Sequence, residues 1–88
     1  MKEYILNGSE FNSRDDAFEY IKEVLELPEY FGNNLDALWD VLSDMKELKI
    51  RIINARQIPR NLKSYGLKML DVFGDVNGIR GIVVEIVW

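Results

Sequence analysis

Three short runs typical of β-strands alternate along this chain with segments of helical periodicity. Residues 3–7 and 48–54 contain apolar runs, the second with basic residues at alternate positions, and residues 81–88 carry the strongest β signal. Parallel neighbours in a sheet need crossover connections, which the helical segments between the runs can supply. The pattern therefore predicts a single α/β domain over residues 1–88, with a small three-stranded parallel sheet covered by about four helices.

Four segments have the apolar spacing of helices, with start or stop signals at their ends. They are residues 14–27, 35–44, about 59–66 and 67–76. Pro28 stops the first, and Asn33 or Asn34 is a natural N-cap for the second because its side-chain oxygen can accept an unpaired amide hydrogen. We expect Tyr65-Gly66 to end the short third helix and Asn77-Gly78 to close the fourth.

The chain has neither cysteine nor histidine. The first absence removes disulfides, thiolate metal sites and thiol catalysis, and the second removes the commonest general base at neutral pH. An enzyme would have to use carboxylates, Lys, Arg or Tyr alone. Because no segment approaches the roughly 20 apolar residues of a membrane span and no N-terminal signal region is seen, we expect a cytoplasmic protein with no membrane partner and no cofactor.

The charges are unevenly distributed along the chain. The net charge of −4 argues against a nucleic-acid partner, which normally binds a strongly basic protein. Residues 1–45 hold eleven acids against three bases, whereas residues 46–68 hold seven bases against Glu47 alone. The simpler interpretation is ordinary variation of a solvated surface. The other is an acidic face that steers a basic partner.

Residues 28–45 combine turn residues, aromatic side chains and acids. At about 100° per residue, Asp36, Asp40 and Asp44 fall on one side of the predicted helix and its apolar residues fall on the other. The apolar stripe consists of Leu38, Val41, Leu42 and Met45, and its first three members are expected to fix the helix to the sheet. Trp39 falls on the acidic side, which is an unusual place for a large indole.

Asp36 and Asp40, four residues apart, are by themselves more typical of a solvated helix face than of a site. In combination with Tyr30-Phe31-Gly32 and Trp39, they favour a protein interface. Phe31 is expected to pack inward. The remaining charges of this stretch are interpreted as rim charges: Glu29 and Asp44.

Two other classes of function stay open. An enzyme or metal protein could use Asp36, Asp40 and Asp75 as acid, base or Mg²⁺ ligands. Against this, the sequence has neither a phosphate-cradling glycine loop nor a nucleophile with its base. An adaptor for some other basic protein could use the same acidic surface.

Residues 27–42, Leu-Pro-Glu-Tyr-Phe-Gly-Asn-Asn-Leu-Asp-Ala-Leu-Trp-Asp-Val-Leu, resemble the signature of the barstar family, intracellular inhibitors of microbial ribonucleases such as barnase. The order of the predicted elements is similar to that family along the whole chain. The resemblance implies a barstar-like fold and a protein that plugs the active site of a small, basic, extracellular-type ribonuclease. It also implies a 1:1 complex, a monomeric free protein, and no metal or cofactor.

The resemblance also implies roles for single residues. By matched position, Asp40 would replace an RNA phosphate among the nuclease's Arg and His residues, and Asp36 would pair with a basic group beside it. The rest of the implied contact surface is Tyr30, Gly32, Asn34, Leu35 and Trp39. Asp75, in the last long helix, stands where the family has a third interface acid and is one methylene shorter than the glutamate expected there. Met45 and Gly74 replace a tryptophan and a long side chain, and these departures leave partner choice open.

Overall fold

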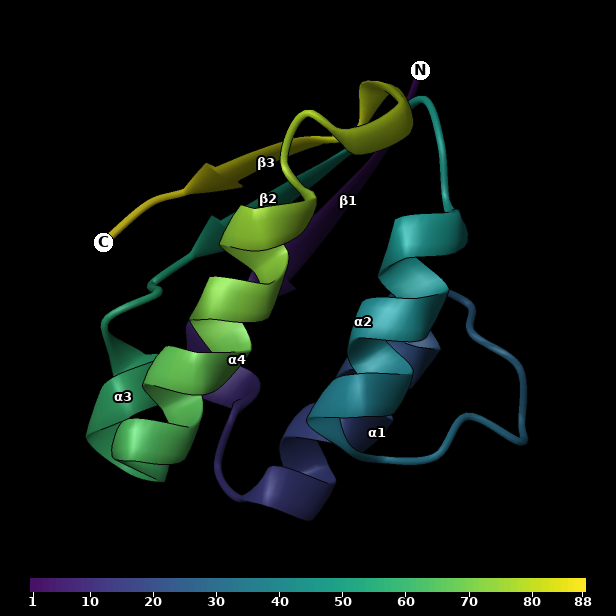
Figure 1. The fold of residues 1–88 in the computed structure, drawn as a ribbon. Coiled ribbons are helices and arrows are strands. Elements are labelled where there is room, and N and C mark those ends of the chain that lie inside the picture. Colours follow the sequence, from purple (N-terminus) through teal and green to yellow (C-terminus); the bar gives the residue numbers. More distant parts are fainter.

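The computed structural model describes all 88 residues, Met1–Trp88. Its elements are β1 (Lys2–Asn7), η1 (Gly8–Glu10), α1 (Arg14–Val24), α2 (Leu35–Asp44), β2 (Leu48–Ile53), α3 (Gln57–Leu62), α4 (Ser64–Val76), η2 (Ile79–Gly81) and β3 (Val83–Ile86), where η marks a short 3₁₀ helix. The three strands pair in parallel in the order β1-β2-β3 (Figure 1). The predicted fold class, a small three-stranded parallel sheet with four α-helices, is confirmed.

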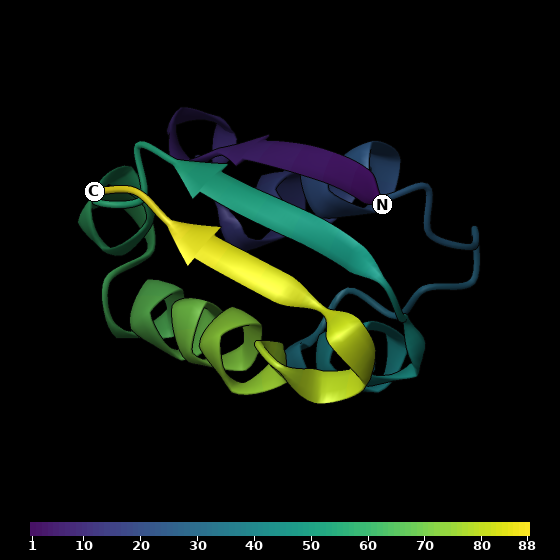
Figure 2. The ribbon, with the colours of Figure 1, turned by 90° about the horizontal axis from the view of Figure 1, so that it is seen from above.

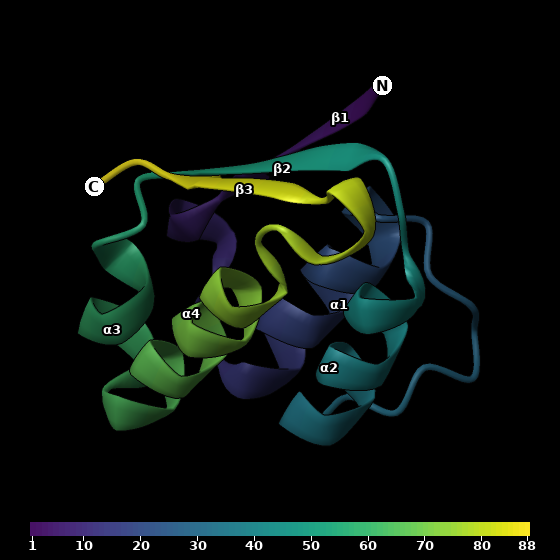
Figure 3. The same ribbon diagram turned by 45° about the horizontal axis from the view of Figure 1, so that its top comes forward.

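The chain crosses the sheet in one direction, from β1 to β2 to β3. Crossovers between parallel strands are right-handed almost without exception, so two crossovers in the same direction place their helices on the same face. Figure 3 shows all four helices under one face of the sheet, and Figure 2 looks onto the other face, which no helix covers. The domain therefore has two layers, with the helices forming one outer surface and the bare sheet the other.

The core lies between these two layers and consists of 19 buried apolar side chains. Ile50 and Ile52 of β2 are fully buried and alternate with Lys49 and Arg51, which lie on the bare face. This alternation is what a strand with one wet face produces. The largest fully buried side chains are Phe11, Phe18 and Phe73.

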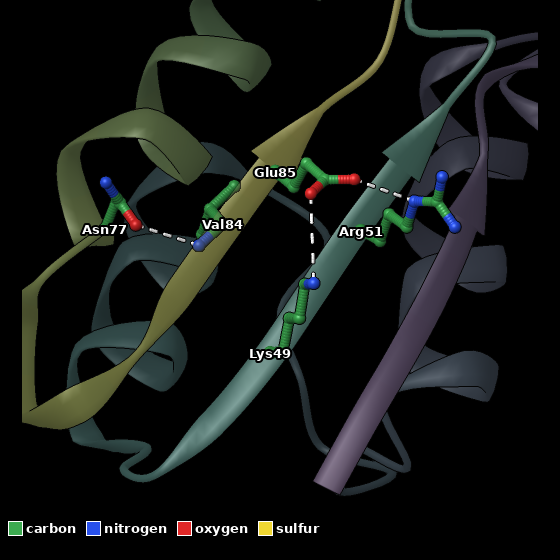
Figure 4. Close-up of polar contacts among 5 residues, drawn as sticks. All are labelled: Lys49, Arg51, Asn77, Val84 and Glu85. Carbon is green, nitrogen blue, oxygen red and sulfur yellow. Dashed lines mark hydrogen bonds and ion pairs between the residues drawn. The ribbon is translucent and has the colours of Figure 1, made fainter. Parts of the chain in front are cut away.

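The bare face of the sheet carries a row of charges. Glu85 of β3 is in register with Arg51 of β2, and its Oε1 lies 2.8 Å from Arg51 Nε while its Oε2 lies 3.8 Å from Lys49 Nζ (Figure 4). The Arg51 contact is an ion pair without hydrogen-bond alignment. Beside this row, Asn77 Oδ1 accepts a hydrogen bond of 2.9 Å from the Val84 N–H and so joins the end of α4 to β3 (Figure 4). Most parallel sheets have helices over both faces, whereas the charged side chains here keep this face exposed to solvent.

The first helix ends at Val24, earlier than we expected. Glu26 has a left-handed φ of 56°, and its N–H bonds to the Glu23 carbonyl at 3.3 Å. The Leu27 N–H bonds to the Lys22 carbonyl at 2.9 Å. These two bonds form a Schellman closure, in which glycine usually occupies the left-handed position. Because a glutamate occupies this position, the sequence carries no glycine signal for the end of the helix.

The boundary between α3 and α4 lies at Lys63, so the expected stop at Tyr65-Gly66 was wrong. Gly66 is buried in the first turn of α4, where a Cβ would come within 2.6 Å of the Ile58 carbonyl oxygen. The glycine therefore lets α4 approach α3 closely and does not end a helix.

The third strand is shorter than the predicted run of residues 81–88. Val87 lies beyond β3, yet its N–H still bonds to the Ile52 carbonyl at 2.8 Å and its carbonyl accepts from the Ala55 N–H at 3.0 Å. The prediction was therefore right about the position of the strand and wrong about its ends.

The second helix packs mainly against α4, and not against the sheet as we expected. Leu38 and Leu42 are fully buried, whereas Val41 is only partly buried because it lies at the edge of the apolar stripe nearest Asp44. Figure 1 shows α2 and α4 side by side, running in the same direction. None of the helices is both long and apolar enough to cross a membrane.

Candidate functional site

The loop of residues 28–34, which joins α1 to α2, is held at two points. The ring of Phe31 lies 6.1 Å from the ring of Phe18, measured between centroids, so Phe31 packs inward as predicted. Asn33 Nδ2 donates a hydrogen bond of 3.0 Å to Glu19 Oε2 on α1. These two contacts tie the loop to α1 at Phe31 and Asn33.

The polar anchor depends on the charge of Glu19. The hydrogen bond from Asn33, and then the ammonium of Lys22 at 3.2 Å, lower the pKa of Glu19 below its ordinary value. Both partners favour the ionised carboxylate, because one donates a hydrogen bond to it and the other carries the opposite charge. The anchor is therefore intact at neutral pH.

Asn34 is the N-cap of α2. Its Oδ1 accepts a hydrogen bond of 2.8 Å from the Ala37 N–H, which has no partner within the helix. Leu35, the first helical residue, is partly buried against the core. Both residues of the predicted contact surface therefore also position the helix.

Three carboxylates form a stripe along α2, at Asp36, Asp40 and Asp44, which we call the acidic stripe. All three are exposed, and none lies within 4 Å of a Lys or Arg nitrogen of the chain. The helix itself contains no basic residue. Their charges are therefore available to a partner and are not neutralised within the fold.

Two large aromatic side chains are exposed on the loop and on α2. Tyr30 is 88% exposed, and Trp39 is 38% exposed. Trp39 therefore lies at the surface, as the helical wheel predicted. Large aromatic side chains are enriched at protein interfaces relative to the rest of the surface.

A surface hollow of about 290 Å³ opens between the loop and α2, and we call it the α2 hollow. Its lining consists of apolar and aromatic side chains, one glycine and two carboxylates. They are Pro28, Tyr30, Phe31, Gly32, Ala37, Asp40, Val41 and Asp44. A Cβ on Gly32 would make only ordinary contacts, the nearest at 3.6 Å to Asn34 Nδ2, so the fold itself would accept alanine there.

The structure groups most of the predicted contact residues on the loop and α2. Tyr30, Gly32 and Asp40 line the α2 hollow, and the others of this group belong to α2 or its cap. Asp75 belongs to another helix, α4. It is exposed in the last turn of α4, whereas Asp36 is in the first turn of the parallel helix α2, so the two acids lie toward opposite ends of this helix pair (Figure 1).

Sequence analysis assigned Asp44 to the rim and Val41 to the core, yet both line the hollow. The spacing of four residues between Asp40 and Asp44 was the available signal for Asp44. Pro28 and Ala37 belong to the signature of residues 27–42, but no feature of the sequence assigned them to the binding surface. The acids Asp36, Asp40 and Asp75 do not converge into a group of three that could hold a metal ion.

Among families of known proteins, the one described as "Barstar (barnase inhibitor)" matches residues 1–87 of this chain. The chain belongs to the barstar family. Among curated proteins, a Bacillus subtilis (strain 168) protein named "Putative ribonuclease inhibitor YrdF" is 34% identical over 53 residues. The match covers 60% of this chain and 58% of that protein, so it spans less than two thirds of the relative's length. The resemblance inferred from residues 27–42 is thus confirmed at the level of the family.

Proposed function

We propose that this barstar-family protein inhibits a small, basic microbial ribonuclease of the barnase type, in a 1:1 complex. One observation supports this most strongly: Asp36 and Asp40 are exposed on a helix without basic residues and have no ion-pair partner in the chain. Carboxylates held in this way can occupy the positions of RNA phosphates in a cleft that binds polyanions.

The energetics explain why such a surface would select a basic cleft. A carboxylate that leaves water for an interface loses hydration, and a weak partner does not compensate for that loss. A cluster of arginines does, because charge-assisted and often bidentate hydrogen bonds replace the lost water. Asp40 would enter the centre of the cleft and Asp36 would pair with a basic group beside it.

The aromatic side chains would supply the remaining contact area. Tyr30 and Trp39 would pack on the walls of the cleft, where large rigid rings exclude water from the charged pairs. Gly32 would allow close approach of the loop, and Asn34 and Leu35 would hold the first turn of α2 in place. Asp75 would contact the same partner only if the footprint extends across α4.

This role is one of binding and not of catalysis, and it needs no cofactor or metal. It also fits a cytoplasmic protein that is monomeric when free and protects cellular RNA from a nuclease. An adaptor for a different basic protein would use the same surface, and the following experiment distinguishes the two.

The test is to titrate the protein into purified barnase, and into other small basic microbial ribonucleases, while RNA cleavage is followed at low and moderate salt. We expect cleavage to fall linearly and to stop at one equivalent of inhibitor. Unchanged cleavage with every enzyme of the panel would contradict the proposal and favour the adaptor.

A further inference from the structure

We infer that Asp44 is a specificity-determining residue, which holds one arginine side chain of the partner in the α2 hollow together with Asp40. The inference rests on the proposed function. It extends that function by giving Asp44 a role in binding and by naming the chemistry of the group that fills the hollow.

The geometry of the hollow suits one long cationic side chain. Asp40 and Asp44 are one helical turn apart on α2, so their carboxylates line the same wall. Tyr30 and Phe31 of the loop contribute aromatic rings to the lining. Because the Phe18 contact fixes Phe31, part of the lining is rigid before a partner arrives.

Asp44 has no role in stabilising the fold. Its carboxylate makes no hydrogen bond or ion pair within the chain. It is the last residue of α2, where the free carbonyl groups give the helix a negative end, and the last turn has no basic residue to offset it. It also lies one turn from Asp40, a like charge. An acid in such an unfavourable position is best explained by a positive group outside the chain.

Arginine fits the hollow better than lysine or histidine does. A guanidinium has five donors in a planar fork, so it can bond to two neighbouring carboxylates at once. The same plane stacks on aromatic rings, and the exposed ring of Tyr30, a residue of the lining, would be free to take that position. Lysine would leave the aromatic side unused, and histidine would lose its charge above neutral pH.

The experiment compares D44N with the matched control E3Q, using the ribonuclease that the titration above finds to be inhibited, with barnase as the first probe. Both substitutions remove one negative charge. Glu3 is exposed on β1 at the bare sheet face, away from the helical layer, so its loss changes the net charge without touching the hollow. Dissociation constants are measured at pH 6 and pH 8, and thermal unfolding checks that both variants fold.

We expect D44N to weaken binding by about tenfold or more, the effect of losing one hydrogen bond to a charged group, and E3Q to change it less than twofold. The effect of D44N should be the same at both pH values. The double variant D40N/D44N should weaken binding by less than the product of the single effects, because both carboxylates hold one cation. When arginines of the nuclease are replaced one at a time by alanine, one replacement should abolish the additional effect of D44N.

The outcomes separate this inference from the function on which it rests. If the wild type inhibits the nuclease but D44N binds as tightly, or no more weakly than E3Q, the role of Asp44 is wrong and the inhibitor function stands. An effect of D44N that disappears at pH 8 would identify histidine and overturn the assignment of arginine. Absence of inhibition by the wild type would overturn both.

Discussion

Asp40 is the residue on which we expect binding to depend most. It lies in the middle of the acidic stripe and lines the α2 hollow, so a partner that covers this surface excludes water from it on several sides. Asp40→Ala should weaken binding by about 3–5 kcal/mol, because it leaves the partner's cations buried without a counter-charge. Asp36→Ala, Tyr30→Ala and Trp39→Ala should follow with smaller losses. Titration calorimetry with the inhibited ribonuclease measures this order.

The matched control for this series is again Glu3→Gln, which should leave the affinity almost unchanged. An affinity lost equally in Asp40→Ala and in the control would mean that only the net charge matters. A larger loss for Trp39→Ala than for Asp40→Ala would mean that apolar contact, and not phosphate mimicry, carries the interface.

Lys63, between α3 and α4, has a strained backbone conformation that sets the direction of α4. It has φ 57° and ψ −136°, a conformation that favours glycine, and it turns the chain so that α4 can pack on α3. Lys63→Gly should therefore raise the free energy of unfolding by about 1 kcal/mol in urea denaturation. Lys63→Ala keeps the Cβ and should bring no gain. Equal free energies of unfolding for Lys63→Gly and Lys63→Ala would show that the backbone at this position is not strained.

At the level of elements, α2 carries charges at its C-terminal end that oppose its own stability. Asp44 lies at the negative end of the helix and one turn from Asp40, so Asp44→Asn should raise the free energy of unfolding by about 0.5–1 kcal/mol. Asp36 is in the first turn, where an acid is favourable, so Asp36→Asn should lower it slightly or leave it unchanged. Thermal or urea unfolding measures both changes in the free energy of unfolding. A gain for Asp44→Asn without a gain for Asp36→Asn would support this view, and equal changes in the two variants would contradict it.

The loop of residues 28–34 should loosen in acid. The pKa of Glu19 is lowered in the folded protein, so its contribution to stability is complete above its ordinary value of 4.5 and is lost as the pH falls through the lower folded value. Between pH 5 and pH 3, Glu19→Gln should therefore lose less stability than the wild type, because a glutamine does not titrate. Parallel pH profiles of unfolding for the two proteins would show that the anchor does not depend on this charge.

Sequence analysis predicted elements better than it predicted their ends and contacts. Asn34 was one of the two N-cap candidates for α2, because side-chain capping leaves a signature in the residue type. The end of α1 was missed because Glu26 adopts a conformation usual for glycine, and Gly66 was misread because close packing of helices also requires glycine. The hollow could not be foreseen, since it depends on how the loop is anchored to α1.

At the scale of the whole molecule, the acids of α2 have no neutralising partners, and the net charge is −4. Long-range attraction should therefore accelerate encounter with a basic nuclease. Raising the ionic strength shortens the distance over which charges act, so the association rate constant should fall by about tenfold or more from 0.01 M to 0.5 M salt, with a smaller change in dissociation. Stopped-flow fluorescence measures both rates. An association rate independent of salt would contradict steering.

The alternation of strands and helices sufficed to predict a parallel sheet, because parallel pairing demands crossovers. It did not reveal that α2 packs mainly on α4, because the apolar stripe of a helix indicates which side is buried and not what covers it. The position of Asp75 relative to the acids of α2 could not be predicted either. It depends on how α4 packs beside α2, which the sequence of α4 does not reveal.

The strand order β1-β2-β3 has a consequence for the kind of ligand this protein can take. Doubly wound α/β proteins hold small molecules in a crevice at the switch point, where successive crossovers depart toward opposite sides of the sheet. A sheet wound in a single direction has no such reversal, so the architecture builds no crevice of this kind at the strand ends. The hollow of this structure lies instead on the helical layer, between α2 and the loop before it, and such an open surface site would suit another macromolecule better than a metabolite.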